Sequence, residues 1–513
     1  MDGLQKGLLI LDFGSQFTLL ITRRIREHQV YSEVWAADDA RVADIDANLC
    51  KGIIFSGGPS SVYEQGEDKA ITRLLGLGIP ILGICYGMQL IATQGGEVEK
   101  ADAGEYGRAK VRIRNSTGMF QNVPHNSDVW MSHGDHIRCA PPGFKITART
   151  ENGTIAAFAS DEKRIWGMQF HPEVSHTKFG TTMLKNFIDL CEAPQTWEAG
   201  NLVEDLIASI SKQIPNDESV ICGLSGGVDS AVTAALLHRA IGDRLVCVMV
   251  DNGLLREGEV EEVEQIFESH FGVKLIVEDA ADAFLNDLRD IKDPEDKRKR
   301  IGHRFIDVFR EAAKRTPNAA WLAQGTLYPD VVESFGANAS ATIKSHHNVG
   351  GLPEELGFKL VEPLREFFKD EVRALGRALG LPDAFISRHP FPGPGLAVRV
   401  LGEVTPERVK TLRQADHIFI SALREFGHYD NVWQGFAVLL PVRSVGVMGD
   451  ARTYEEVIAL RAVTSVDGMT ADRCDLPISF LGIVSDRIIN QVQHVNRVVY
   501  DVTSKPPGTI EWE

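Results

Sequence analysis

Short apolar runs alternate with helix-like segments along the first 195 or so residues of the chain. Such runs, when amphipathic segments separate them, are typical of a buried and mostly parallel sheet that is covered by helices. From about residue 111 the pattern changes to turn-punctuated β segments, before one more strand and a final helix. We expect strands at 8–11, 52–55, 79–84 and 165–170, and helices at 17–27, 88–93 and 182–190.

A second α/β pattern begins after a linker at residues 192–195. Its elements form a β-loop-α-β unit, so the strands should be parallel and the crossover between them right-handed. The expected elements are a helix at 202–212, a strand at 220–224, a helix at 231–241 and a strand at 245–250.

A third region begins where residues 388–395 read Arg-His-Pro-Phe-Pro-Gly-Pro-Gly. Three prolines and two glycines among eight residues cannot continue a helix, so a domain boundary is expected there. We therefore expect two doubly wound α/β domains, at 1–195 and 196–388, followed by a smaller α+β domain at 389–513.

The composition limits the class of protein. A chain of 513 residues is too long for one core, and its formal net charge of -17 would repel a phosphate backbone over most of its surface. We therefore expect no nucleic-acid partner, whereas small anionic substrates need only a local basic pocket. No run approaches the ~20 apolar residues of a membrane helix, and residues 7–13 fit a buried first strand better than a signal peptide.

Cysteine usage points to a reducing compartment. None of the cysteines forms a C-x-x-C pair, and their number is odd, which argues against a disulfide framework or a zinc site. A cytoplasmic location follows as an expectation. The seven cysteines lie at positions 50, 85, 139, 191, 222, 247 and 474.

Cys85 lies at the predicted turn between a strand and a helix, with Gly83 and Gly87 on either side. A nucleophile elbow needs small neighbours, because its central residue is strained and must protrude. The helix N-terminus favours the thiolate, and the Tyr86 N–H can help to form an oxyanion hole. By itself, however, a lone cysteine is usually a small buried hydrophobe.

A base for this cysteine is expected at His171, which follows the strand at 165–170. Residues two apart in an extended chain face the same side, so Glu173 could orient the His171 ring and complete a Cys-His-Glu triad. The loop after the strand at 52–55 reads Ser-Gly-Gly-Pro, and the amide of Gly58 could supply the second oxyanion donor.

These motifs closely resemble those of the triad-type glutamine amidotransferases, whose elbow reads G-x-C-x-G-x-Q and whose base reads H-P-E. The resemblance covers roughly residues 7–195. It implies that Cys85 attacks the side-chain amide of glutamine, that ammonia leaves from a thioester, and that water then releases glutamate.

The second α/β pattern holds a phosphate-binding candidate between its first strand and helix. Residues 225–230 read Ser-Gly-Gly-Val-Asp-Ser, and loop amides at a helix N-terminus form an anion site. The loop is not a Walker motif, because it has no lysine. Val250 ends the next strand, where a nucleotide lies at an α/β switch point.

The loop resembles that of the ATP pyrophosphatases, which cleave ATP between the α and β phosphates. The resemblance implies that Asp229 binds Mg²⁺ and that Lys369, otherwise an exposed helix lysine, contacts phosphate. ATP and Mg²⁺ are thus the expected co-substrate and metal. The predicted ATP-binding residues are Ser225, Gly226, Gly227, Val228, Asp229, Ser230, Val250 and Lys369.

Three further segments bear on the acceptor. Residues 297–303 form the densest basic cluster, which is either a solvated helix start or a pocket for a substrate phosphate. Residues 343–352 look like a mobile lid, with a metal site as the rival reading for His346 and His347. The tail at 505–513 carries an aromatic residue and two prolines, so it could be ordered.

Taken together, these segments resemble the glutamine-hydrolysing GMP synthetases from about residue 7 to residue 513. The matching stretches are the start at 11–16, the cluster near Arg298, the lid, residues 389–395 and the terminal K-P-P-G-T-I-E-W-E. The one departure noted is Phe17, where a tyrosine is frequent in the family. The resemblance implies XMP as acceptor, contacts to it from Arg298, Lys505 and Glu511, and a homodimer formed through the C-terminal domain.

The expected reaction is XMP, ATP, glutamine and water giving GMP, AMP, pyrophosphate and glutamate through an adenylyl-XMP intermediate. Three alternatives remain at this point. A related enzyme could amidate a carboxylate, as in NAD synthesis. A pyrophosphatase that thiolates tRNA is the second alternative, and it would need a basic RNA-binding face and paired cysteines. A non-enzymatic scaffold is the third, and it would have no need of an intact triad and phosphate loop.

Overall fold

The computed structural model describes residues 6–45, 48, 50–63, 69–114, 118–174, 176–335, 357–448, 451–465, 471–505 and 507–513. The chain divides into two compact units, each described by itself. The first comprises Met1–Glu198 with Val332–Ala339, and the second comprises Ala199–Val331 with Ser340–Glu513. Among the described residues, no helix combines the length and the apolar character needed to cross a membrane.

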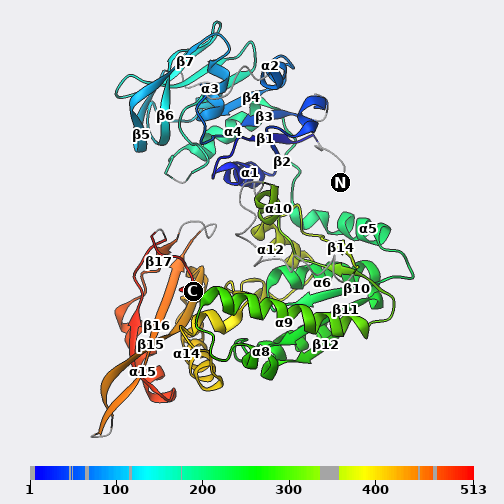
Figure 1. Cartoon of the computed structure of the whole chain (residues 1–513). Helices are drawn as coiled ribbons and strands as arrows, with labels where there is room; N and C mark the ends of the chain where they lie inside the picture. The colour runs from blue at the N-terminus through cyan, green and yellow to red at the C-terminus, as the bar shows by residue number, and fades with distance from the viewer. Residues whose placement is uncertain are drawn as a thin grey trace. The chain divides into compact units, whose positions relative to one another are not determined.

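The first unit is built on one nine-stranded sheet with the order β2-β1-β3-β4-β9-β8-β7-β5-β6 (Figure 1). Neighbouring strands from β2 to β9 in this order are parallel. These strands are β1 (Leu8–Asp12), β2 (Ser32–Ala36), β3 (Gly52–Phe55), β4 (Ile81–Ile84) and β9 (Ile165–Met168).

Helices cover both faces of this parallel half. Alternate residues of β1 enter two separate cores: Leu8 and Ile10 pack in one cluster, and Leu9 and Leu11 in the other. Because both faces are buried, the strands read as continuous apolar runs, which confirms the doubly wound prediction. The helices are α1 (Thr18–Glu27), α2 (Lys69–Leu75), α3 (Tyr86–Ala92) and α4 (Gly180–Leu190).

The other half of the sheet is antiparallel, as the turn-punctuated sequence after residue 111 indicates. The prediction of a mostly parallel sheet therefore holds only for strands β2, β1, β3, β4 and β9. The antiparallel strands are β5 (Glu97–Ile113), β6 (Asn126–Cys139), β7 (Lys145–Thr150) and β8 (Ile155–Ser160).

The second unit begins with a five-stranded parallel sheet in the order β12-β11-β10-β13-β14. Its strands are β10 (Ser219–Leu224), β11 (Leu245–Asp251), β12 (Lys274–Asp279), β13 (Ala319–Ala323) and β14 (Lys359–Val361). The accompanying helices are α5 (Val203–Gln213), α6 (Val228–Ile241), α7 (Glu259–Glu264), α8 (Ala281–Asp287), α9 (Pro294–Lys314), α10 (Tyr328–Phe335), α12 (Lys369–Ala378) and α13 (Asp383–Ile386).

The last part of the second unit is an α+β arrangement around two long antiparallel strands, which are drawn in orange in Figure 1. The strands are β15 (Gln434–Met448), β16 (Ala451–Thr464), β17 (Asp472–Arg473) and β18 (Val495–Tyr500), and the helices are α14 (Pro406–Glu425) and α15 (Ile478–Gln491). Ala437 and Ile458 pack in the cluster that contains α14 and α15 residues, whereas Phe436 and Ala459 pack with Ile510 of the tail.

One hydrophobic cluster runs through the whole second unit. It contains Ile221 and Val248 of the parallel sheet together with Phe419 of α14 and Leu460 of β16. The residues after position 388 therefore share a core with the parallel sheet.

Candidate active sites

Cys85 occupies a strained turn between β4 and α3. Its backbone angles are φ 53° and ψ −107°, which a non-glycine residue rarely adopts. A side chain at Gly87 would place its first carbon 2.4 Å from the carbonyl oxygen of Phe55, so only glycine fits there. The predicted elbow is present, and α3 begins at Tyr86 rather than at 88, because the cysteine itself is the residue before the helix.

His171 and Glu173 lie beside this cysteine and are buried. The Nδ1 atom of His171 lies 2.7 Å from Oε1 of Glu173, and the side chains are 4% and 0% exposed. Because Nδ1 is engaged by the carboxylate, Nε2 remains for the sulfur of Cys85.

The charges around His171 favour its protonated form. Burial alone lowers the pKa of His171, but the Glu173 carboxylate, together with hydrogen bonds to Cys85 and Glu173, outweighs burial and raises the pKa to about 10. An imidazolium held between a carboxylate and a sulfur stabilises a thiolate, which is the nucleophilic form of cysteine.

Two contacts to the sulfur were not expected from the sequence. The Cys85 Sγ atom lies 3.5 Å from the carbonyl oxygen of Ser132 and 3.8 Å from Nε2 of Gln169. Gln169 directly follows β9 and is 0% exposed. The sequence signal for this contact is the position of Gln169 two residues before His171, since residues two apart share one side of an extended chain.

The loop at 56–59 lies beside the elbow. A side-chain carbon at Gly58 would be 3.2 Å from the Tyr86 ring, and one at Gly57 would be 3.2 Å from the His171 ring. The structure thus brings both predicted oxyanion residues together with the predicted base.

Phe17, the noted departure from the family pattern, also reaches this site. Its ring meets the His171 ring edge-on, with centroids 5.2 Å apart and an interplanar angle of 69°. The sequence assigns no consequence to this residue, because nothing local indicates that the segment around Phe17 lies against the histidine.

The loop at 225–230 joins β10 to α6. Gly226 has φ 73°, and Ser230 Oγ accepts a hydrogen bond from the Ser225 amide at 3.2 Å. Since α6 begins at Val228 and not at 231, Asp229 and Ser230 lie in its first turn. Val250 lies at the end of β11, whose register places it next to the start of this loop.

Asp229 has neighbours from distant parts of the chain. Nζ of Lys369 lies 3.1 Å from Asp229 Oδ2, and a side-chain carbon at Gly325 would lie 3.1 Å from the Asp229 backbone. The Asp229 Oδ1 atom is buried and has no hydrogen-bond partner among the described residues. The structure therefore brings the predicted lysine to the predicted loop.

Arg388 and Glu259 also surround the loop and were missed. Arg388 donates a hydrogen bond to the carbonyl oxygen of Gly226 at 2.9 Å and pairs with Glu262. Glu259 is buried against Gly226, and burial raises the pKa of its carboxyl. Nothing in the sequence places residue 388 near residue 226.

The tail at 507–513 is held by buried cations. Glu511 accepts hydrogen bonds from Arg399 at 2.8 and 3.1 Å and from Gln434 at 2.7 Å. Arg461, 1% exposed, donates to the carbonyl oxygens of Thr509 and Ile510. The expectation of an ordered tail is confirmed for these residues.

The basic cluster on α9 divides into two kinds of side chain. Arg298 donates a hydrogen bond to the main-chain oxygen of Glu513 at 2.6 Å. Lys297 is 0% exposed and bonds to the carbonyl oxygen of Val400 and to the Glu513 carboxylate. For Lys297 the reading as a solvated helix start is wrong, because its ammonium lies against the Val400 carbonyl and the Glu513 carboxylate rather than in solvent.

The three predicted acceptor-binding residues do not form one cluster in the described contacts. Arg298 contacts Glu513 at the end of the tail, whereas Glu511 is held by Arg399 and Gln434. Lys505 instead forms an antiparallel bridge with Ala471, with N···O distances of 2.7 and 3.0 Å.

The expected lid at 343–352, with His346 and His347, lies outside the described residues. Within the residues that are described, no group of three or more His, Cys, Asp or Glu side chains could hold a metal ion.

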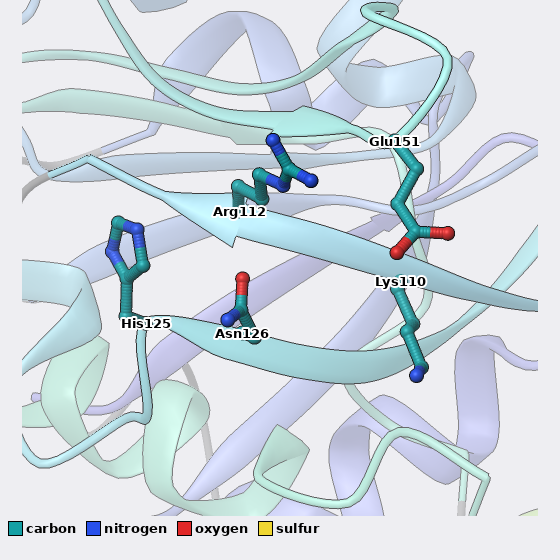
Figure 2. Close-up of a pocket in the computed structure, with 5 residues that line it drawn as sticks. All are labelled: Lys110, Arg112, His125, Asn126 and Glu151. Atoms are coloured by element: carbon teal, nitrogen blue, oxygen red, sulfur yellow. The ribbon is translucent and has the colours of Figure 1, made fainter.

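An open hollow of about 350 Å³ lies on the antiparallel half of the first unit. Figure 2 shows Lys110 and Arg112 on β5, His125 and Asn126 at the start of the neighbouring strand, and Glu151 beside them. It contains none of the residues that the sequence predicts for either site.

Comparison with known proteins gives three family matches along the chain. Residues 9–190 match glutamine amidotransferase class-I, 201–298 match NAD synthase, and 421–512 match the GMP synthase C terminal domain. A GMP synthase [glutamine-hydrolyzing] from Aquifex aeolicus is 55% identical over 513 residues, which cover 99% of this chain and 100% of the relative. This chain belongs to the glutamine-hydrolysing GMP synthase family.

A second GMP synthase, from Brachyspira hyodysenteriae, is 53% identical over 509 residues and covers 99% of both chains. A solved structure of a putative GMP synthase subunit from Thermoplasma acidophilum covers 36% of this chain and 93% of its own, at 32% identity and a TM-score of 0.32. The GMP synthase family membership confirms the resemblance drawn from the motifs and the prediction of a glutamine-dependent ligase.

Proposed function

We propose that this chain makes GMP by the ATP-dependent amination of XMP, with ammonia taken from glutamine. The observation that carries the proposal is the conjunction of two sites on one chain: a strained, buried Cys85 beside His171, and a glycine loop that opens α6 beside Lys369. The first site releases ammonia, and the second activates an oxygen that ammonia displaces.

In the first site Cys85 attacks the side-chain amide of glutamine. His171, oriented by Glu173, gives a proton to the leaving ammonia and later takes one from the water that releases glutamate. Amides at Gly58 and Tyr86 hold the oxygen that becomes negative in each step. The short distance between His171 and Glu173 supports these roles.

In the second site the C2 oxygen of XMP attacks the α-phosphorus of ATP, and pyrophosphate leaves. Amides at 225–230, Val250 and Lys369 hold the nucleotide, and the positive charge of Lys369 offsets the charge that grows on pyrophosphate. Ammonia then attacks C2 of adenylyl-XMP and AMP leaves.

Mg²⁺ is proposed to accompany ATP, with Asp229 as its anchor. A buried carboxylate oxygen without a hydrogen-bond partner among the described residues fits a cation that prefers oxygen ligands. Bound there, Mg²⁺ would neutralise charge on the phosphate oxygens.

XMP is proposed to contact Arg298, Lys505 and Glu511. Arg298 contacts the last residue of the tail, and Glu511 lies two residues before it, which supports a substrate pocket near the chain end. Lys505→Ala is the test, because an ammonium group pairs readily with a phosphate and alanine removes only that side chain. If Lys505 holds the phosphate, its removal should weaken the binding free energy of XMP by about 1.5–3 kcal/mol, and the KM for XMP should rise accordingly. An unchanged KM would refute this contact.

We further propose three domains, at 1–195, 196–388 and 389–513, a cytoplasmic location, and a homodimer through the last of them. Val445, Val447 and Tyr454 expose large apolar side chains on one face of the β15–β16 pair, which supports a buried partner surface. Tyr454→Asp should give a monomer by sedimentation, whereas Tyr63→Asp, an exposed tyrosine of the first unit, should not. A dimeric Tyr454→Asp protein would refute this surface.

A coupled assay tests the whole proposal. The full chain, supplied with XMP, ATP, Mg²⁺ and glutamine, should form GMP, AMP and pyrophosphate in equal amounts. ADP with orthophosphate would refute cleavage between the α and β phosphates. Activity on nicotinate adenine dinucleotide without activity on XMP would favour carboxylate amidation. This alternative is tested because residues 201–298 match NAD synthase.

A further inference from the structure

Gln169 lies against the sulfur of Cys85, although none of the proposed chemical steps uses it. Its Nε2 atom is 3.8 Å from Cys85 Sγ, and the residue is 0% exposed. A buried amide N–H is costly when nothing accepts it, and sulfur is its acceptor here.

The orientation of this amide is fixed by its other end. Oε1 of Gln169 accepts a hydrogen bond from Nε2 of Gln89 at 3.5 Å, and that same nitrogen donates to the carbonyl oxygen of Asp135 at 3.0 Å. Since a backbone carbonyl and an amide oxygen can only accept, Gln89 must present its NH₂ group to both. Gln169 must then turn its own NH₂ group toward the sulfur.

The opposite side of the sulfur carries a different group. The carbonyl oxygen of Ser132 lies 3.5 Å from Sγ and accepts only when the thiol carries its proton. A carbonyl oxygen repels a thiolate, whereas an N–H attracts it. The sulfur thus lies between one group that favours the thiol and one that favours the thiolate.

We infer that Gln169 is a positioning residue for the amidotransferase reaction, which stabilises negative charge on the Cys85 sulfur by donating an N–H···S hydrogen bond. This inference rests on the proposed role of Cys85 and adds a second donor to the imidazolium of His171. Gln89 acts one step further away, by fixing which end of the Gln169 amide faces the sulfur.

The test is the rate at which iodoacetamide alkylates Cys85 in the full-length protein, measured across pH by mass spectrometry of the Cys85 peptide. Peptide-level detection is necessary because Cys139 is exposed. The ionisable groups around the sulfur are His171 and Glu173, with His133 on β6 and its neighbour Glu105, and all four stay in place in the variants.

Gln169→Leu should lower the alkylation rate at neutral pH by roughly three- to tenfold, the size of one modest hydrogen bond. The rate at high pH, where the thiolate is fully formed, should not change. Gln169→Glu should lower the neutral rate further, because it aims a negative charge at the sulfur. An unshifted profile, or a loss of equal size at every pH, would overturn the inference.

Asn186→Leu is the matched control. Asn186 is an amide of the same unit that donates to the carbonyl oxygens of Met119 and Gln121, so its removal costs two hydrogen bonds away from the sulfur. Its alkylation profile should be that of the unaltered protein. Alkylation needs no glutamine, so this test stands even if Cys85→Ala proves that another residue hydrolyses glutamine.

Discussion

The two candidate sites differ in the sequence separation between the residues that form them. In the first unit the base and its orienting carboxylate are two residues apart and the elbow is a single strand-to-helix turn, although Gln169 reaches the Cys85 sulfur across 84 residues. In the second unit Lys369 meets Asp229 across 140 residues, and Arg399 meets Glu511 across 112.

The first site is thus assembled from two local motifs, the strained turn at Cys85 and the His171–Glu173 pair, which the pairing of β4 with β9 brings together. The second site needs α9, α12 and the tail to reach their final places before its charges meet. We therefore expect substitutions in the first site to change chemistry with little change in folding, and some in the second to change both.

Asp229→Ala should give the largest loss. It should lower GMP formation on the order of a hundredfold or more with either glutamine or ammonium, because adenylation precedes amination in both cases. Asp243→Ala, at an exposed position after α6, is the control and should keep full activity. Near-normal turnover of Asp229→Ala with ammonium would remove this carboxylate from the mechanism.

Glu511→Gln should destabilise the second unit. Arg399 is 0% exposed, and the change leaves its guanidinium only the 4.0 Å contact with Asp416 as a counter-charge, which costs up to about 3–5 kcal/mol, the range for removing one partner of a buried pair. Calorimetry should show the unfolding transition of the second unit at a lower Tm, with the first unit unaffected.

Glu425→Gln, which breaks an exposed pair with Arg487, controls for charge alone and should leave that Tm unchanged. Equal Tm values for Glu511→Gln and the unaltered protein would contradict the view that the tail holds this unit together. A deletion of residues 505–513 tests substrate binding less cleanly, since it would also leave Lys297 buried and unpaired.

The first unit should lose stability as pH rises. His171 has a folded pKa of about 10, above its ordinary value of 6.5, so its contribution is fully present below 6.5 and is lost between 6.5 and 10. Unfolding midpoints of the unaltered protein and of His171→Ala should converge over this range. A difference that grows with pH would contradict the charged pair.

Phe17→Leu should have the smallest effect. Loss of the edge-on contact costs about 0.5–1.5 kcal/mol and should lower kcat for glutamine hydrolysis a fewfold, with ammonium-dependent synthesis unchanged. Phe17→Tyr restores the residue frequent in the family and keeps the ring, so its kcat should stay near that of the unaltered protein. An equal loss in both variants would contradict a packing role.

The same division explains what the sequence predicts and what it does not. The elbow, the H-P-E pair and the glycine loop are all local patterns, and the structure places them on the expected turns. Lys297 and Arg399 were not predicted as tail anchors, because their partners lie 216 and 112 residues away. Gln169 lies within a local motif but carries no charge, so nothing in its residue type indicates a contact with sulfur.

Two independent sites cooperate through ammonia, and Cys85→Ala tests this cooperation most directly. GMP formation by this variant should be measured with glutamine and, separately, with an ammonium salt. Complete loss is expected with glutamine, and a rate close to that of the unaltered protein with ammonium. Full glutamine-dependent activity, or equal loss with both nitrogen donors, would contradict it.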